Sequence, residues 1–326
     1  MTLPEIFDSF NRLNVLILGD IMLDAYVWGK VERISPEAPV PVVVAQRREF
    51  RLGGAGNVVL NVAALGAKAV ICSVVGRDGY GDQLLRILDE NGLSREGIVQ
   101  SHERITTVKE RIIAGSQQVV RVDTETDAPI AETDRRALVE RAKKLAETAD
   151  VIIFEDYDKG VLNAETIAEV TAFANARGIP TVVDPKKRNF LHYHGVTLFK
   201  PNLKELREGL NLTVDGRNPA ELETAVARLK TTLRAQGTLI TLSERGVFID
   251  FREEKHHLPA HVRQIADVSG AGDTVISIAA CALALGLPPR QLAALANLGG
   301  GLVCESVGVV PIDKRLLLEE AQREGL

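Results

Sequence analysis

Short apolar runs alternate along this chain with helical patterns, and this alternation constrains the fold more than any other feature of the sequence. The apolar runs are typical of buried strands and cover residues 15–20, 70–75, 151–154, 181–184 and 238–242. Helical patterns lie between and around them at residues 57–65, 82–91, 134–148, 164–177 and 219–236. Because helices that connect neighbouring strands leave those strands parallel, the order predicts an α/β fold with helices on both faces of a mainly parallel sheet.

Two segments, residues 25–51 and 104–125, depart from this alternation. The first is rich in Val, charge and Pro, and the second alternates apolar with polar side chains. Such alternation is typical of antiparallel strands with one solvated face, so we expect a small β-sheet that projects from the main body. A sheet over the mouth of an α/β core would act as a lid. A decorated sheet edge is the alternative that the pattern leaves open.

The composition argues against several classes of protein. Hydrophobic residues make up 45% of the chain but aromatic residues only 4%, so the core must consist of Val, Leu, Ile and Ala. A formal net charge of −5 gives no electrostatic reason to bind nucleic acid. No apolar stretch reaches the roughly 20 residues of a membrane span, and the N-terminus lacks the pattern of a signal peptide. Cys72, Cys281 and Cys304 lie in apolar runs, as reduced core residues do. We therefore expect a cytoplasmic enzyme or binding protein without a membrane partner.

The segment 267–273 carries the clearest chemical signal. It reads Asp-Val-Ser-Gly-Ala-Gly-Asp and precedes an apolar run, 275–285, that is typical of a buried helix. Glycines allow a ligand to approach the backbone, and the N-terminus of a helix favours an anion. The Asp273 carboxylate would lie beside that anion. A turn and a helix cap are the common explanation of a bare Gly-x-Gly, but two flanking carboxylates favour phosphoryl transfer.

Polar residues near the first strand indicate a small polar ligand. Asp20 and Asp24 follow that strand, where carboxylates either bind sugar hydroxyls or cap a turn, and the sequence leaves both roles open. The segment 53–57 reads Gly-Gly-Ala-Gly-Asn before a helix. It lacks the third glycine and the buried strand of a dinucleotide fingerprint. Close packing against a small polar ligand explains it better.

Residues 202–205, Asn-Leu-Lys-Glu, open another helix. Asn202 and Glu205 share a helix face and could together hold a hydrated Mg²⁺ against phosphates. A capping box has the same spacing, and spacing alone favours the cap. No Walker A loop occurs, so an ATP site would be of another kind.

Basic residues indicate a phosphorylated substrate. Lys186 and its neighbours follow the fourth predicted strand, and Lys109 and Arg111 lie two apart on one strand of the predicted lid, so they face one way. A lone pair of this kind is usually a solvated face, but two basic groups around one pocket favour a phosphate. The three histidines of residues 256–261 have no partner at metal-ligand spacing and are interpreted as surface residues.

Together these motifs resemble those of the ribokinase-like (PfkB) carbohydrate kinases. Residues 267–273 are similar to the family signature, with Ser269 in place of the usual Thr. Gly53, Gly54 and Asn57 resemble the substrate motif, and residues 202–205 the Asn-x-x-Glu motif. Segments 33–41, 156–160 and 183–186 resemble one branch, whose members phosphorylate heptose 7-phosphate. That branch also has a nucleotidyltransferase part with a His-x-Gly-His motif, which is not found in this sequence. Whether the kinase stands alone or belongs to a bifunctional protein stays open.

The resemblance implies a three-layer α/β/α core with a small β-sheet lid, as one carbohydrate kinase domain over residues 1–326. It implies ATP and Mg²⁺ as cofactors and a homodimer through the lid, and it leaves a monovalent cation open. The implied reaction is phosphorylation of the anomeric hydroxyl of D-glycero-D-manno-heptose 7-phosphate to the 1,7-bisphosphate, in the synthesis of ADP-heptose for lipopolysaccharide. A kinase for another sugar, of the fructose 1-phosphate or ribose type, and a non-catalytic sensor of sugar or nucleotide are the alternatives.

The resemblance also implies roles for individual residues. Asp273 would be the catalytic base, and the backbone of Gly270, Ala271 and Gly272 would form the anion hole. ATP would contact Asn202, Leu203, Lys204, Glu205, Ser243, Glu244, Gly246 and Asn297, with Mg²⁺ held by Glu205 through water. The sugar phosphate would contact Asp24, Gly53, Gly54, Asn57, Lys109, Arg111, Asp184 and Lys186.

Overall fold

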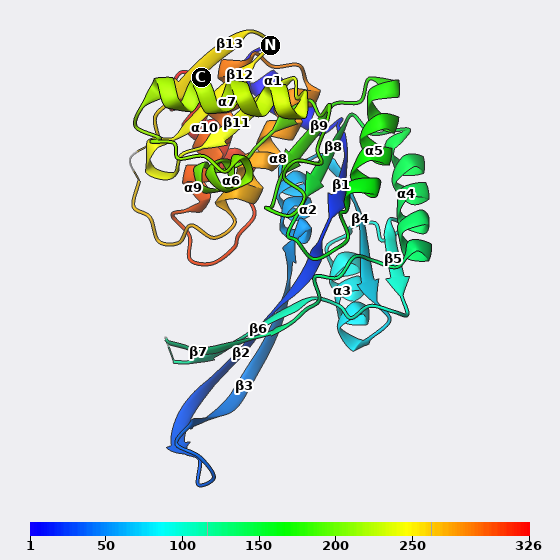
Figure 1. Cartoon of the computed structure of the whole chain (residues 1–326). Coiled ribbons are helices and arrows are strands. Elements are labelled where there is room, and N and C mark those ends of the chain that lie inside the picture. Colours follow the sequence, from blue (N-terminus) through cyan, green and yellow to red (C-terminus); the bar gives the residue numbers. More distant parts are fainter. Residues whose placement is uncertain (116, 262) are drawn as a thin grey trace.

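A central sheet of nine strands forms the middle layer of the computed structural model, which describes residues 1–115, 117–261 and 263–326 (Figure 1). Its strand order is β13-β12-β11-β10-β9-β8-β1-β4-β5. The parallel strands are β1 (Asn14–Gly19), β4 (Lys68–Gly76), β5 (Ile98–Ser101), β8 (Val151–Glu155), β9 (Thr181–Asp184), β10 (Leu198–Phe199) and β11 (Gly237–Thr241). Two antiparallel strands, β12 (Val247–Phe251) and β13 (Glu254–Leu258), complete one edge. All five predicted strands are present, and the mainly parallel sheet is confirmed.

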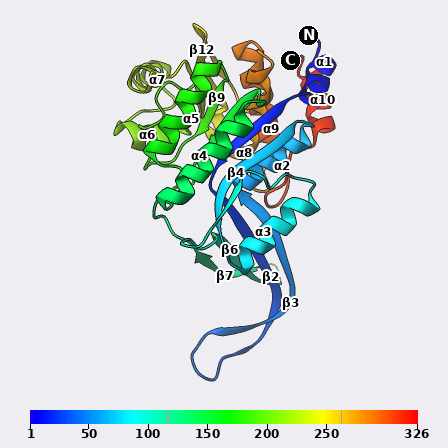
Figure 2. The same cartoon turned by 90° about the vertical axis from the view of Figure 1, so that its right-hand side faces the viewer.

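Helices cover both faces of this sheet, because successive side chains of each strand point to opposite sides. Val15 and Ile17 of β1 belong to one hydrophobic cluster, and Leu16 and Leu18 to the other. The first face carries α1 (Leu3–Phe10), α2 (Ala55–Ala64), α3 (Gly79–Glu90), α8 (Ala271–Ala284), α9 (Pro289–Val303) and α10 (Lys314–Arg323). The second face carries α4 (Glu132–Ala146), α5 (Ala164–Arg177), α6 (Leu203–Leu210) and α7 (Pro219–Leu233). Figure 2 shows α4 and α5 side by side on this second face. The three-layer architecture is confirmed.

A second sheet of four strands projects from the central body (Figure 1). Its order is β3-β2-β6-β7, and the strands are β2 (Ile21–Ile34), β3 (Pro41–Gly54), β6 (Val108–Ala114) and β7 (Gln117–Thr124). We expected antiparallel pairing throughout, which is wrong for one pair: β2 and β6 run parallel. These two strands are not joined by a hairpin, since the chain returns to the central sheet through β4 and β5 before it enters β6.

Asp20, the single residue between β1 and β2, connects the central sheet to the loop after β8. Its buried carboxylate accepts hydrogen bonds from the backbone N–H groups of Tyr157 at 2.8 Å, Lys159 at 3.1 Å and Val161 at 3.0 Å. Of the two roles that the sequence left open, Asp20 therefore has the structural one. This contact holds the 156–160 loop over the carboxyl ends of the central strands.

The predicted buried helix after residue 273 is confirmed as α8, whose side chains from Asp273 to Leu283 are buried. Within the described ranges, no helix combines the length and the apolar character that a bilayer span requires.

Candidate active site

Three buried carboxylates meet at the carboxyl ends of the central strands. Glu155 ends β8, Asp184 ends β9, and Asp273 lies in the first turn of α8. Glu155 and Asp184 are neighbours in the parallel pairing of their strands. One oxygen atom from each of the three side chains lies within 4.8 Å of the other two, a spacing that a metal ion could bridge. Ligands of open α/β sheets bind at this edge, so the cluster marks the candidate site.

Asp273 is held in place by two side chains from other parts of the fold. The Asn57 amide donates to Oδ2 at 2.5 Å, and the Tyr157 hydroxyl donates to Oδ1 at 3.0 Å. Burial raises the pKa of Asp273 to about 6, although the Asn57 hydrogen bond acts in the opposite direction. At neutral pH the carboxylate is therefore ionised, oriented and basic enough to take a proton from a hydroxyl.

The backbone at the start of α8 leaves room beside this carboxylate. Gly270 has a φ of 81° at the N-cap position, a conformation that side chains rarely adopt. A Cβ atom on Gly272 would meet nothing closer than Asp184 Oδ2 at 3.7 Å and Lys200 Nζ at 3.8 Å. The N-terminus of α8 and the Lys200 amine therefore border one open position, which suits an anion.

Two lysines supply positive charge to the site. Lys200 Nζ lies 2.7 Å from Asp184 Oδ2, with both side chains buried, and Lys186 Nζ lies 2.9 Å from Glu205 Oε1. Burial opposes the charge of Lys186, but Asp184 and Glu205 outweigh it and raise the pKa of this amine. Both amines therefore remain charged and can neutralise a phosphoryl group.

Glu155 differs from its neighbours because neither of its buried carboxyl oxygens has a hydrogen-bond partner among the described residues. Burial first, and then the charges of Asp184 and Asp273, raise the pKa of Glu155 well above its ordinary value. A raised pKa favours the neutral form of this carboxyl group, which would lessen the repulsion between the three carboxyl groups of the cluster.

Residues 202–205 form the capping box that their spacing favoured. Asn202 Oδ1 accepts from the Glu205 N–H and Glu205 Oε2 accepts from the Asn202 N–H, both at 2.8 Å. Each Glu205 oxygen has one donor, so lone pairs are left for a water bound to Mg²⁺ and the carboxylate fits that role. The Leu203 side chain packs into the core, so only its backbone can face a nucleotide, while the Lys204 side chain is 81% exposed.

The other residues predicted to bind the nucleotide lie at the same end of the central strands. Ser243 and Glu244 lie in the 3₁₀ turn η1 (Ser243–Arg245), and Gly246 follows with a φ of 83°. Thr241 donates its N–H to Pro201 at 3.2 Å, which brings this turn beside residues 202–205. Asn297 of α9 donates to the carbonyl of Pro259 at 2.8 Å.

The residues predicted to bind the sugar phosphate lie in two places. Asn57, Asp184 and Lys186 join the carboxylate cluster, whereas Asp24, Lys109 and Arg111 belong to the second sheet. Arg111 Nη1 lies 2.5 Å from Asp24 Oδ1, and a Cβ atom on Gly53 would lie 2.3 Å from Asp24 Oδ2. Glycine is therefore required at position 53 for Asp24 to stay in place, while the backbone of Gly54 lies against the Asp20 carbonyl.

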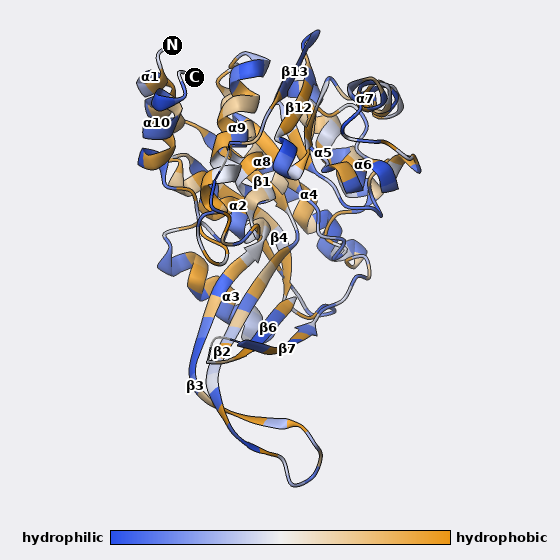
Figure 3. Cartoon of the chain, turned by 90° about the vertical axis from the view of Figure 1, so that its left-hand side faces the viewer, coloured by the Kyte–Doolittle hydropathy of each residue, from blue (hydrophilic) through white to orange (hydrophobic). Residues whose placement is uncertain are grey.

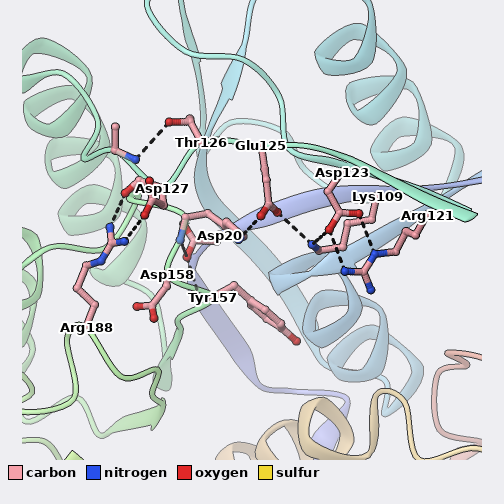
Figure 4. A network of polar contacts seen from close by, with 12 residues as sticks. Asp20, Lys109, Arg121, Asp123, Glu125, Thr126, Asp127, Tyr157, Asp158 and Arg188 are labelled. Atoms are coloured by element: carbon pink, nitrogen blue, oxygen red, sulfur yellow. Dashed lines mark hydrogen bonds and ion pairs between the residues drawn. The ribbon is translucent and has the colours of Figure 1, made fainter.

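Lys109 is already paired with carboxylates of its own chain. Figure 4 shows its amine directed at Asp123 and Glu125, at 3.2 and 3.0 Å. Lys159 contacts the other oxygen of Glu125 at 2.9 Å. A phosphate would have to compete with these carboxylates for Lys109, whereas Lys186 is closer to the cluster.

Sequence reasoning missed Glu155, Tyr157 and Lys200 as site residues. Tyr157 lies within a segment, 156–160, that carried the family resemblance, and Lys200 directly precedes Pro201 and Asn202. Glu155 follows the apolar run 151–154, so its place at the carboxyl end of a predicted strand was the available signal.

The fold with this site is that of the ribokinase-like sugar kinases. The chain superposes on the tetrameric inhibited form of phosphofructokinase-2 from Escherichia coli with a TM-score of 0.79 and 18% identity, covering 95% of this chain and 100% of that one. Ribokinase from Arabidopsis thaliana, complexed with ribose and ATP, gives a TM-score of 0.73 at 16% identity, covering 94% and 99%.

The chain belongs to the pfkB family of carbohydrate kinases, whose family model matches residues 12–315. It is 41% identical to the bifunctional protein HldE of Syntrophotalea carbinolica over 99% of its own length and 66% of the relative. It is 44% identical to HldE of Caulobacter vibrioides over 92% of its length and 62% of that relative. The chain thus spans less than two thirds of the length of these relatives. As a member of this family it is a sugar kinase, a phosphotransferase with an alcohol group as acceptor.

Proposed function

We propose that this kinase transfers the γ-phosphoryl group of ATP to the anomeric hydroxyl of D-glycero-D-manno-heptose 7-phosphate, within ADP-heptose synthesis for lipopolysaccharide. The observation that carries the reaction type is the buried, oriented Asp273 carboxylate at the N-terminus of α8. The choice of heptose rests on segments 33–41, 156–160 and 183–186 and agrees with the HldE relatives. Because ATP and sugar phosphates are substrates found inside cells, we place the enzyme in the cytoplasm.

The proposed mechanism uses the residues of the carboxylate cluster. Asp273 accepts the proton of the sugar hydroxyl, while Asn57 and Tyr157 hold its two oxygens in position. The N–H groups of residues 270–272, together with Lys200, stabilise the charge of the phosphoryl group in transfer. Mg²⁺, held through water by Glu205, would neutralise charge on the phosphates of ATP. A monovalent cation requirement stays open.

Recognition of the sugar phosphate divides between the two parts of the site. We assign the hydroxyl contacts to Asp24, Asn57 and the backbone of Gly53 and Gly54, which are all buried. The 7-phosphate would be bound by Arg111 and Lys186, with Lys109 available once it leaves Asp123 and Glu125. Arg111 is held in place by Asp24, so it can offer its remaining N–H groups to a phosphate.

A panel of acceptors with coupled detection of ADP tests this assignment. We expect strong ADP release with one anomer of heptose 7-phosphate, and rates at least about a hundredfold lower with fructose 1-phosphate, free fructose and free ribose. Activity on free ribose or fructose without activity on heptose 7-phosphate would reject the heptose assignment. Sugar binding without ADP release from any acceptor would instead identify a sensor.

We also infer a homodimer through the second sheet. Among the described residues, β2 pairs with β3 alone beyond residue 29, and this two-stranded end carries exposed Ile34 (60%), Val40 (51%) and Val44 (48%). Figure 3 shows hydrophobic residues on this projecting end. An isolated two-stranded ribbon is marginally stable in water, so a second copy that covers it would be stabilising. We expect sedimentation to show a dimer that Val44→Lys in β3 dissociates. Val307→Lys, on an exposed loop elsewhere, should leave the dimer intact, and a monomeric wild type would refute the inference.

A further inference from the structure

A cavity of about 430 Å³ lies beside α7 at the edge of the central sheet, away from the carboxylate cluster. Its lining includes Leu222 of α7, Phe248 of β12, Lys255 and His257 of β13, and Arg245 of η1. This volume lies in the range of small-molecule sites, which combine an apolar floor with a few polar groups.

The cavity opens on the opposite face of the edge strands from the predicted nucleotide site. Phe248 and Leu222 belong to the hydrophobic cluster of the α7 face. Val247 and Ile249 point to the other face, into the cluster of α8 and α9, and α9 carries Asn297. A ligand in this cavity would therefore be separated by the strands themselves from a nucleotide that contacts Asn297.

The lining carries an excess of positive charge, although the whole chain has a formal net charge of −5. Among the described lining residues, three side chains are cationic, those of Arg217, Arg245 and Lys255, and one is a carboxylate, that of Glu223. Lys255 contacts Glu223 at 2.7 Å and Arg217 contacts Asp215 at 3.0 Å, so these two cations have partners. The Arg245 Nε is buried and has no hydrogen-bond partner in the part of the chain that the structure describes, and a carboxylate oxygen of Glu244 lies 3.6 Å away.

Arg245 also connects the cavity to both segments predicted to hold ATP. It lies in the turn between Ser243 and Gly246. A Cβ atom on Gly216 would lie 3.0 Å from both Arg245 Nη atoms and 2.6 Å from Leu203, the residue after Asn202. A ligand that draws the guanidinium toward the cavity would therefore act on the turn and on the start of α6.

We propose that this cavity is a second binding site, for a small organic anion with a flat apolar body and a phosphate or carboxylate group, and that its occupancy changes the affinity for ATP. The anion contacts Arg245, Lys255 and His257, and the body lies on Phe248 and Leu222. The coupling to ATP rests on the proposed function, whereas the binding site does not.

Calorimetry with phosphoenolpyruvate, which has a phosphate, a carboxylate and a flat three-carbon body, tests the site without turnover. We expect the wild-type chain and Asp273→Asn to bind phosphoenolpyruvate equally. Arg245→Gln and Lys255→Gln should bind it at least tenfold more weakly. Lys144→Ala, which replaces an exposed lysine of α4, should bind it as wild type does. Lys255 is 46% exposed, so its replacement leaves the core intact. The proposed site would be overturned if wild type did not bind phosphoenolpyruvate, or if Arg245→Gln and Lys255→Gln bound it as tightly as wild type.

The coupling has a separate readout. With phosphoenolpyruvate at saturation we expect the KM for ATP to change at least threefold in wild type and to stay constant in Lys255→Gln. An unchanged KM in wild type, despite calorimetric binding, would remove the regulatory part of the proposal. Failure of the kinase assignment itself would leave the calorimetric result unaffected.

Discussion

Two carboxyl groups at the central sheet and one on the second sheet have pKa values that are shifted in opposite directions. At the carboxyl edge of the central sheet, Glu155 and Asp273 are buried and their pKa values are raised. On the second sheet, hydrogen bonds from Arg121 and Lys109 outweigh slight burial and lower the pKa of Asp123. The difference shows that removal from water prepares a carboxylate for proton transfer, whereas pairing with cations fixes it as a positioning group.

The largest expected effect tests the central sheet's side of this comparison. Asp273→Asn removes the base but keeps an amide of the same shape, so the fold should remain and turnover should fall at least about a hundredfold. Steady-state kinetics with circular dichroism measures both. Asp82→Asn, an exposed carboxylate of α3, is the matched control and should keep normal turnover. A near-normal rate for Asp273→Asn would end its assignment as the base.

Glu155→Gln tests whether a buried carboxyl without partners weakens the fold. Because the pKa of Glu155 is higher in the folded chain than in the unfolded chain, the unfolded chain loses this proton at lower pH. The free energy of unfolding therefore falls as the pH rises from 4.5 toward the folded pKa. The variant should therefore be more stable than wild type at pH 8 and equal to it near pH 4. Urea unfolding at both pH values measures the difference. A variant less stable than wild type at pH 8 would show that the ionised group has a partner.

The acidic side of the pH profile of kcat/KM should report the deprotonation of Asp273. Asp273 acts when deprotonated, so activity should fall about tenfold per pH unit below its pKa of about 6. Asp123→Asn, on the second sheet, should leave the position of this limb unchanged because its carboxylate titrates below the ordinary range. A limb near pH 4 would mean that Asp273 is more hydrated than its burial indicates.

The smallest effect belongs to the second sheet. Arg111→Gln should raise the KM for heptose 7-phosphate up to about tenfold with little change in kcat, because it removes a binding contact and leaves the base in place. Arg121→Gln, half exposed on β7, should change KM less than about twofold. A large loss of kcat in Arg111→Gln would mean that Arg111 also contributes to the chemical step and not only to substrate binding.

Local patterns in the sequence were enough to predict five strands of the central sheet, helix α8 and the sugar-kinase motifs. The strand runs, the helix after residue 273 and the residues 202–205 each lie within a short segment whose hydrophobic period or capping spacing acts locally. Parallel pairing of β2 with β6 was not predictable in this way, because alternation specifies a solvated face and not the direction of a partner.

The sequence by itself determined the fold class, the family and the motif that puts the Asp273 carboxylate beside a helix N-terminus. Only the tertiary structure decided which side chains set its properties. Tyr157 and Asn57 are 116 and 216 residues away along the chain, and Glu155 and Asp184 reach it from separate strands. The pKa of a carboxylate depends on burial and on neighbours in space, and these exist only after the chain has folded.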